Sequence, residues 1–218
     1  MKHFDMVGPV SRTITPMRKS SFTIIWHGMA AHPGDDKGVV TGFIESLPGD
    51  TIKYELDKDS GYLMIDRAQR TTAAPPCLYG FIPRTYCAEN VAARCAGAEE
   101  ADGDPLDICV YSERDINRTD IILQAKVLGG IQMIDGGEAD DKIIAVLDGD
   151  NVWGGIEDLA EMPSIIVERL QHYFSTYKQV PGKNPNINVD VVYGRDQALE
   201  VIAAAQADYD HHYGHLHA

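Results

Sequence analysis

The order of secondary-structure signals along the chain constrains its fold most strongly. From about Thr41 to Leu147 the sequence consists of short β-type segments, and helical segments appear only afterwards. Residues 52–56 alternate apolar and charged side chains, and a turn at 59–61 leads into a return strand at 62–67, which together predict a β-hairpin. Strands first and helices last favour an α+β fold, in which a small closed or curled barrel is flanked by two C-terminal helices.

Further strands and both helices are predicted from local patterns. The additional strands are expected at 107–111, 121–128, 131–134 and 142–147. A glycine pair, Gly129-Gly130, predicts a bulge or sharp bend between two of them. Pro163 suits the first turn of a helix that ends near Tyr177, and a second helix is expected from about residue 196 to 209. Residues 84–101 predict a surface loop or short helix.

The N-terminal part of the chain lacks this regular patterning. Residues 1–40 contain three scattered prolines and a Gly-Asp-Asp turn signal, and they predict an extension with one strand around 22–26. Residues 41–218 are expected to form a single domain, because 218 residues suit one well-buried core. No apolar run approaches the ~20 residues that cross a bilayer, so no membrane span is expected.

The charge balance limits the partners of the protein. Asp and Glu number 33 against 19 Lys and Arg, and the formal net charge is −14. Such a chain repels nucleic acid and anionic membranes. It also repels a polyanionic substrate unless metal ions reverse the local field. The four cysteines contain no CxxC pair and are expected to be reduced thiols, which indicates a cytoplasmic protein.

Three carboxylates fall within the six residues Asp102-Gly-Asp104-Pro-Leu-Asp107. The glycine and proline keep this segment out of a helix. If it is extended, Asp102 and Asp104 point to one side, while Leu106 and Ile108 anchor it in the core. Crowded carboxylates repel one another, and hard divalent cations relieve that repulsion because they prefer oxygen ligands. Taken alone, the segment is equally consistent with a solvated acidic turn.

A second acidic cluster follows at residues 135–142. Its glycines permit a tight turn that would bring Asp135 and Asp140 toward one metal ion. Lys142 lies two residues after Asp140 and would share its side of a strand. An acid beside a base suits a site for metal and phosphate, although a surface salt bridge would look the same.

Cationic and phenolic residues stand at comparable positions elsewhere in the chain. Lys53 lies beside Glu55, Arg67 lies at a strand end, and Tyr177-Lys178 follows the first late helix. Lysine as a point charge and arginine as a fork both suit phosphate oxygens. Each of them singly would otherwise be a solvated surface residue.

Together these segments resemble the soluble inorganic pyrophosphatases of the Mg²⁺-dependent type with an OB-like barrel. The family signature is Asp, a small or polar residue, Asp, Pro or Glu, a hydrophobe, Asp and a hydrophobe, and residues 102–108 satisfy every place. Residues 53–55, 66–67, 76–80, 133–142 and 172–178 also resemble the family, in the same order. The resemblance extends from about Thr41 to Lys178.

The resemblance implies a set of metal-binding roles. Asp102, Asp107 and Asp140 would hold one activating Mg²⁺, and Asp107 would bridge to a second. Asp135 and Asp140 would help to bind ions that arrive with the substrate. Glu45 and Glu55 would order metal-bound waters.

The same resemblance implies the catalytic and phosphate-binding roles. Asp104 would be the general base, and Lys53, Arg67 and Tyr177 would act with it. The two phosphate groups would be held by Lys53, Arg67, Tyr79, Lys142, Tyr177 and Lys178. Many relatives carry another phosphate-contacting tyrosine at the position of Pro75, so one leaving-group contact is expected to be missing here.

The implied reaction is hydrolysis of inorganic pyrophosphate to two orthophosphates by a metal-activated water. Two alternatives stay open: hydrolysis of a larger phosphoanhydride, and a noncatalytic protein that binds metal or phosphate. The resemblance also implies a homo-oligomer. Because the chain length lies between those of hexameric and dimeric members, a hexamer is favoured and a dimer is the alternative.

Overall fold

A closed five-stranded barrel forms the centre of this computed structural model, which describes residues 24–180, 182 and 186–217. The strands pair in the order β1-β4-β6-β9-β7, and β1 also pairs with β7, which closes the barrel. Strands β6 and β9 run parallel, whereas the other pairings of the barrel are antiparallel. The predicted α+β fold with a small barrel is confirmed. The strands are β1 Val39–Ser46, β4 Leu78–Phe81, β6 Asp107–Tyr111, β7 Ile121–Asp135 and β9 Lys142–Leu147.

Strand β7 has 15 residues and pairs with several other strands. Its first half pairs with β1, and its second half pairs with β10 (Ile187–Gly194). The register with β9 shifts between Val127 and Gly129. A side chain at Gly130 would collide with the ring of Tyr193, so glycine lets β10 approach. The predicted irregularity at Gly129-Gly130 is therefore confirmed, but the two strands predicted around it are one continuous strand.

The predicted hairpin is present as a separate two-stranded sheet of β2 (Ile52–Leu56) and β3 (Leu63–Ala68). Lys53 lies opposite Arg67, and the register shifts between Lys53 and Tyr54. A β-bulge of this kind increases the local twist and redirects side chains. The hairpin therefore presents two cations side by side.

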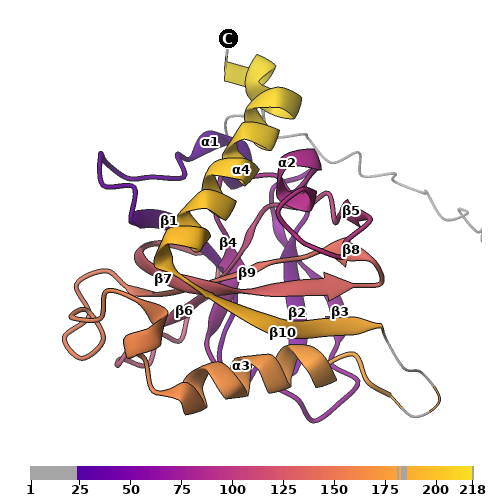
Figure 1. Cartoon of the computed structure of the whole chain (residues 1–218), viewed down its shortest axis with the longest axis vertical. Coiled ribbons are helices and arrows are strands. Elements are labelled where there is room, and N and C mark those ends of the chain that lie inside the picture. The colour runs from indigo at the N-terminus through magenta and orange to yellow at the C-terminus, as the bar shows by residue number, and fades with distance from the viewer. Residues whose placement is uncertain (1–23, 181, 183–185, 218) are drawn as a thin grey trace, which may run out of the picture.

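Both predicted late helices are present, and they lie at opposite ends of the molecule (Figure 1). Helix α3 (Ser164–Thr176) packs against β10 and buries Leu170 and Phe174, whereas α4 (Arg195–Tyr213) packs against β7. Residues 84–101 contain the short helix that the sequence suggested, α2 (Glu89–Ala92). The remaining short elements are β5 Glu100–Ala101, β8 Glu138–Ala139 and the 3₁₀ turns η2 Leu159–Glu161 and η3 Gly214–His217.

The strand predicted around residues 22–26 is wrong where the structure describes it. Residues Ile25–Gly28 form a short helix, α1, and residues 22 and 23 lie outside the described part. Trp26 is 3% exposed and belongs to a hydrophobic cluster with Phe43, Phe81 and Tyr209. The helical turn allows the indole ring to pack in this cluster. An isolated strand at this position would instead have backbone groups without a sheet partner. The division into an extension at 1–40 and a domain at 41–218 stays a prediction.

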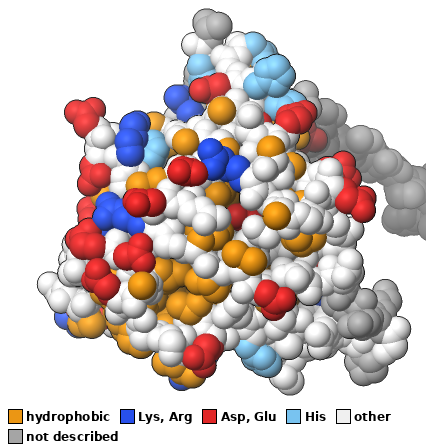
Figure 2. Space-filling view, viewed as in Figure 1, with side chains coloured by type: hydrophobic (Ala, Val, Ile, Leu, Met, Phe, Trp, Pro, Cys, Tyr) orange, Lys and Arg blue, Asp and Glu red, His pale blue; other side chains and the backbone are white. Residues whose placement is uncertain are grey.

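Hydrophobic side chains gather between β10 and α3 on the face shown in Figure 2. Val192 is exposed there, and Met162 and Val167 line a shallow hollow beside it. Monomers rarely expose large contiguous apolar patches, so such a face suggests an interaction surface. None of the described helices has the length and apolarity that a bilayer span requires.

Candidate active site

The barrel, the hairpin and the end of α3 enclose one cavity of about 240 Å³. All thirteen side chains singled out in the sequence line this cavity, although they come from segments far apart in the chain. The structure therefore brings together every predicted site residue. They are Glu45, Lys53, Glu55, Arg67, Tyr79, Asp102, Asp104, Asp107, Asp135, Asp140, Lys142, Tyr177 and Lys178.

The segment that carries Asp102 and Asp104 is a turn, so the condition of an extended chain, under which the two side chains would point to one side, is not met. The backbone N–H of Asp104 donates to Oδ1 of Asp102 at 3.1 Å. Gly103 has a φ of +71°, a left-handed conformation that glycine adopts without strain. Leu106 is completely buried, and its N–H donates to the Thr85 hydroxyl at 2.9 Å. The predicted anchoring by Leu106 and Ile108 is confirmed.

Lys142 connects the two acidic clusters. It is the register partner of Asp107 across the parallel pair β6–β9, which places both side chains at the same end of the barrel. The side chain of Lys142 is 2% exposed, and its ammonium group donates to both Asp107 and Asp140. Tyr79 donates its hydroxyl to the same oxygen of Asp107. Burial alone would lower the pKa of Lys142, but Asp107 and Asp140 raise it, so the lysine stays charged.

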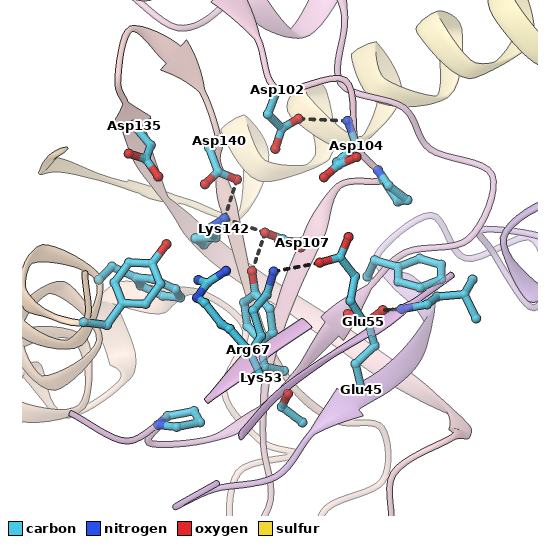
Figure 3. Close-up of a pocket in the computed structure, with 18 of the residues that line it drawn as sticks. Glu45, Lys53, Glu55, Arg67, Asp102, Asp104, Asp107, Asp135, Asp140 and Lys142 are labelled. Carbon is cyan, nitrogen blue, oxygen red and sulfur yellow. Dashed lines mark hydrogen bonds and ion pairs between the residues drawn. The ribbon is translucent and has the colours of Figure 1, made fainter. Parts of the chain in front are cut away.

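The hairpin forms the opposite wall. Lys53 Nζ lies 3.0 Å from Glu55 and 3.1 Å from Asp66, and Arg67 also pairs with Asp66 at 2.6 Å. Glu45 on β1 lies beneath these residues and accepts a 2.7 Å hydrogen bond from the Leu56 N–H. Burial raises the pKa of Glu45 to about 8. Figure 3 shows this wall facing Asp102, Asp107 and Asp140 across the cavity.

The third wall joins the end of β7 to the end of α3. Asp135, the last residue of β7, pairs with Lys178, which follows α3. Tyr177 stands beside it, and its ring lies 5.3 Å from the Lys178 ammonium. Burial raises the pKa of Tyr177, so its hydroxyl is a donor at neutral pH. An acid, a base and a phenol therefore meet at one edge of the cavity.

The carboxylates fit divalent cations by their chemistry. Burial raises the pKa values of Asp102 and Asp140, and each is raised further by a neighbouring carboxylate. Doubly charged ions favour the ionised forms and accept oxygen ligands. Among residues 24–180, 182 and 186–217, no three acidic, histidine or cysteine side chains already converge as one ligand set. Lysine ammonium groups form ion pairs with several of these acids, so metal binding requires some of those ion pairs to break.

Among the other residues that line the cavity, Lys58 and Trp26 were not identified from the sequence. Lys58, in the hairpin turn, pairs with Asp104, and Trp26 of α1 lies behind it. A single lysine in a turn shows no pattern, and its partner is 46 residues away. The expected extension at residues 1–40 gives no reason to connect Trp26 with the acidic turn.

Comparison with known proteins agrees with this geometry. A family described as "Inorganic pyrophosphatase" matches residues 42–210. The chain is 42% identical over 206 residues to an inorganic pyrophosphatase of Chlamydia muridarum, which covers 88% of this chain and 98% of that protein. It is 34% identical to soluble inorganic pyrophosphatase 2 of Chlamydomonas reinhardtii, over 86% of this chain and 89% of that protein.

A solved structure gives the same result. The inorganic pyrophosphatase of Thermus thermophilus superposes with a TM-score of 0.70 at 32% identity, and the match covers 83% of this chain and 97% of that one. The site, the sequence match and the fold agree, and the chain belongs to the inorganic pyrophosphatase family.

Proposed function

We propose a residue-level mechanism for the hydrolysis of inorganic pyrophosphate to two orthophosphates, the reaction of the family to which the chain belongs. The family implies a divalent metal cofactor, and we assign it as Mg²⁺. The observation that carries the proposal is the meeting of two acidic clusters and a set of cationic and phenolic side chains in one cavity. Metal ions and phosphate are the ligands that such a mixture accommodates together.

The acids divide into metal ligands and water-ordering groups. Asp102, Asp107 and Asp140 would hold the activating ion, and Asp107 would also help to hold a second. Asp135 and Asp140 would help to hold ions that enter with the substrate, and Glu45 and Glu55 would orient coordinated waters. When bound, Mg²⁺ lowers the pKa of a coordinated water and offsets phosphate charge. This arrangement explains how a chain with net charge −14 binds a polyanion.

Asp104 accepts the proton of the attacking water. Its carboxylate lies in a turn whose backbone is fixed on both sides, since Cys87 N–H donates to its carbonyl at 2.8 Å and its own N–H is bound by Asp102. Phosphoryl transfer needs little covalent assistance, so positioning and charge neutralisation carry most of the catalysis. These tasks belong to Lys53, Arg67, Tyr79, Lys142, Tyr177 and Lys178.

Replacement of the base tests the assignment. We expect Asp104→Asn to lower kcat by about 10²–10⁴-fold, the usual contribution of general base catalysis, with the fold intact. The measurement is phosphate release from Mg²⁺–pyrophosphate. Asp190→Asn, at an exposed position of β10, is the matched control and should retain full activity. Full activity in Asp104→Asn would show that the base is another group.

The size of the cavity favours pyrophosphate over a larger phosphoanhydride. Its volume of about 240 Å³ lies below the range of roughly 300–1,000 Å³ typical of sites for drug-sized ligands. A substrate panel separates the alternatives: we expect fast phosphate release from pyrophosphate and slow release from nucleoside triphosphates with Mg²⁺. Equal rates would favour the broader hydrolase, and no turnover of either would favour a noncatalytic binding protein.

We extend the proposal to assembly and location. A homo-oligomer, with a hexamer favoured over a dimer, is supported by the apolar face between β10 and α3. The acidic charge supports the absence of nucleic-acid and membrane partners. Four buried cysteines, all as free thiols, support a cytoplasmic location. Light scattering coupled to size-exclusion chromatography distinguishes hexamer, dimer and monomer by mass.

A further inference from the structure

We propose that Trp26 and Lys58 form a positioning unit for Asp104. Lys58 orients the Asp104 carboxylate, and Trp26 orients Lys58. The inference rests on the proposed function of Asp104 as general base, but it concerns residues to which that mechanism gives no role. Trp26 also lies before residue 42, where the family match begins.

Lys58 is held in a tight turn at the tip of the hairpin. Asp57 accepts a 3.1 Å hydrogen bond from the Ser60 N–H, and its carbonyl accepts the Gly61 N–H at 2.7 Å. These bonds fix the backbone from which the Lys58 side chain extends. Its ammonium group donates to Oδ1 of Asp104, so the hairpin reaches across the cavity to the acidic turn.

Trp26 forms a rigid surface behind this ion pair. The residue is 3% exposed, and the Lys58 ammonium lies 5.8 Å from the ring centroid, within the range of a cation–π contact. The indole N–H donates to the Thr85 carbonyl at 2.8 Å, and the Trp26 carbonyl accepts the Arg84 N–H at 2.8 Å. The ring therefore cannot turn without loss of a buried hydrogen bond.

The tryptophan and the base share one support, the segment 84–87. Thr85 is completely buried, and its hydroxyl accepts the Leu106 N–H at 2.9 Å while donating to the Ile82 carbonyl at 2.6 Å. Cys87 donates to the Asp104 carbonyl from the same segment. The position of the indole relative to Asp104 is thus fixed through a few buried bonds.

In this geometry Lys58 and Trp26 have different roles. Lys58 makes a directional contact with one oxygen of Asp104, which leaves the other oxygen for the proton of the attacking water. Trp26 limits the volume that a long, flexible lysine can explore, because a charged group is attracted to the face of an indole ring. Since small errors in the position of a reacting group cost large factors in rate, loss of either residue should lower kcat.

A double-mutant cycle tests the unit. We expect Lys58→Met to lower kcat about tenfold or more while KM changes less than about threefold, because the residue acts on the base and not on binding. Lys58→Arg should restore part of the loss. Trp26→Leu should lower kcat less, and it should cause little further loss in the Lys58→Met background, since coupled residues are not additive. Trp26→Phe keeps a weaker ring face and replaces Trp26→Leu in the cycle if the latter fails to fold.

Matched controls use residues of the same type outside the cavity. Lys126 pairs with Glu157, and Trp153 lies in the turn after β9, so Lys126→Met and Trp153→Phe should leave kcat within about twofold. The chain has two tryptophans, so Trp153→Phe leaves Trp26 as the sole fluorophore. In that background, Lys58→Met should shift the emission of Trp26, whereas Lys126→Met should not.

Three results would overturn the unit. These are kcat within twofold of wild type in Lys58→Met, fully additive effects of the Trp26 and Lys58 substitutions, and unchanged Trp26 emission on loss of Lys58. Each leaves the assignment of the base untouched if Asp104→Asn is inactive. Full activity in Asp104→Asn would instead remove the assignment on which this inference rests.

Discussion

At the scale of single residues, Lys142 shows how the site is stable before it binds metal. A nearly buried ammonium group is costly unless it is paired, and here it pairs with two carboxylates, one of which also accepts a hydrogen bond from the Tyr79 hydroxyl. Burial of the two carboxylates is also costly, and their ion pairs with the lysine reduce that cost. The cation thus performs electrostatically part of what a divalent ion does in the working enzyme.

Removal of this lysine should make stability depend on metal. Without metal, we expect Lys142→Met to lower the free energy of unfolding by about 3–5 kcal/mol, because Asp107 and Asp140 lose their buried partner. Mg²⁺ should restore more stability to this variant than it adds to the wild type, since ligands that bind only the native state stabilise it. Urea unfolding in EDTA and in Mg²⁺ measures both effects.

The exposed Lys37 supplies the control for that experiment. Lys37→Met should change the free energy of unfolding by less than about 0.5 kcal/mol. A Lys142→Met protein as stable as wild type in EDTA would show that the pairings of Lys142 contribute nothing to the metal-free state.

Residue chemistry also explains which site residues the sequence could reveal. Twelve of the thirteen predicted residues occur in short segments that resemble the family in the same order, so a pattern existed to be recognised, whereas Glu45 lies outside these segments. Lys58 and Trp26 become significant only through contacts with Asp104 and Thr85, residues distant in the chain. No local pattern can show such a relation, because it is created by folding.

At the scale of elements, Asp208 joins the late helix α4 to the short helix α2. The carboxylate is 1% exposed and accepts hydrogen bonds from the backbone N–H groups of Ala88, Asn90 and Val91 at 3.0–3.1 Å. The first N–H groups of a helix have no partner within the helix, and an acid there also suits the helix dipole. A four-residue helix that is unstable alone is in this way held by a residue 118 positions away.

Loss of this cap should destabilise the protein and loosen α2. We expect Asp208→Ala to lower the free energy of unfolding by about 2–3 kcal/mol, because several buried donors lose their acceptor together. Hydrogen exchange at 89–92 should accelerate more than exchange in the barrel. Asp210→Ala, at an exposed position of the same helix, should change stability by less than about 0.5 kcal/mol. Equal effects of the two substitutions would contradict the capping role.

An element could be predicted when its own residues show a periodic pattern, and it was missed when only its contacts with distant residues define it. The hairpin and both late helices have clear periodicity and were predicted. Strand β10 was missed, although Ile187–Gly194 is β-rich, because only its pairing with β7 across Gly129-Gly130 distinguishes it from a connecting segment. The sequence left the conformation of the acidic turn open, because residue order alone does not reveal the left-handed φ that Gly103 adopts.

At the scale of the whole molecule, the buried acid Glu45 contributes a term to stability that falls with rising pH when metal is absent. Burial raises the pKa of Glu45 from 4.5 to about 8. An acid with a raised native pKa binds its proton more tightly in the folded state, so its contribution is full below pH 4.5 and is lost as pH rises through 8. The slope for one such group is at most about 1.4 kcal/mol per pH unit.

This linkage gives a measurable difference between two proteins. In EDTA between pH 6 and pH 9, we expect Glu45→Gln to lose less stability than the wild type, because glutamine keeps an acceptor for the Leu56 N–H but cannot ionise. Urea unfolding at four pH values gives both curves. Parallel curves would show that Glu45 has an ordinary pKa in the native protein.

The long strand β7 has a consequence for the way the chain is made. It pairs with β1, more than 70 residues earlier, and with β10, more than 50 residues later. During synthesis, the barrel therefore cannot close until β7 has left the ribosome and can pair with β1. The pairing of β7 with β10 can form only after β10 has been synthesised. Because such distant pairings form slowly, the nascent chain exposes unpaired strand edges for longer than a helical protein does. Chains truncated before residue 187 lack β10 and leave the edge of β7 unpaired, so they should aggregate. Insertions into loops that do not connect the partners of β7 should disturb these pairings less.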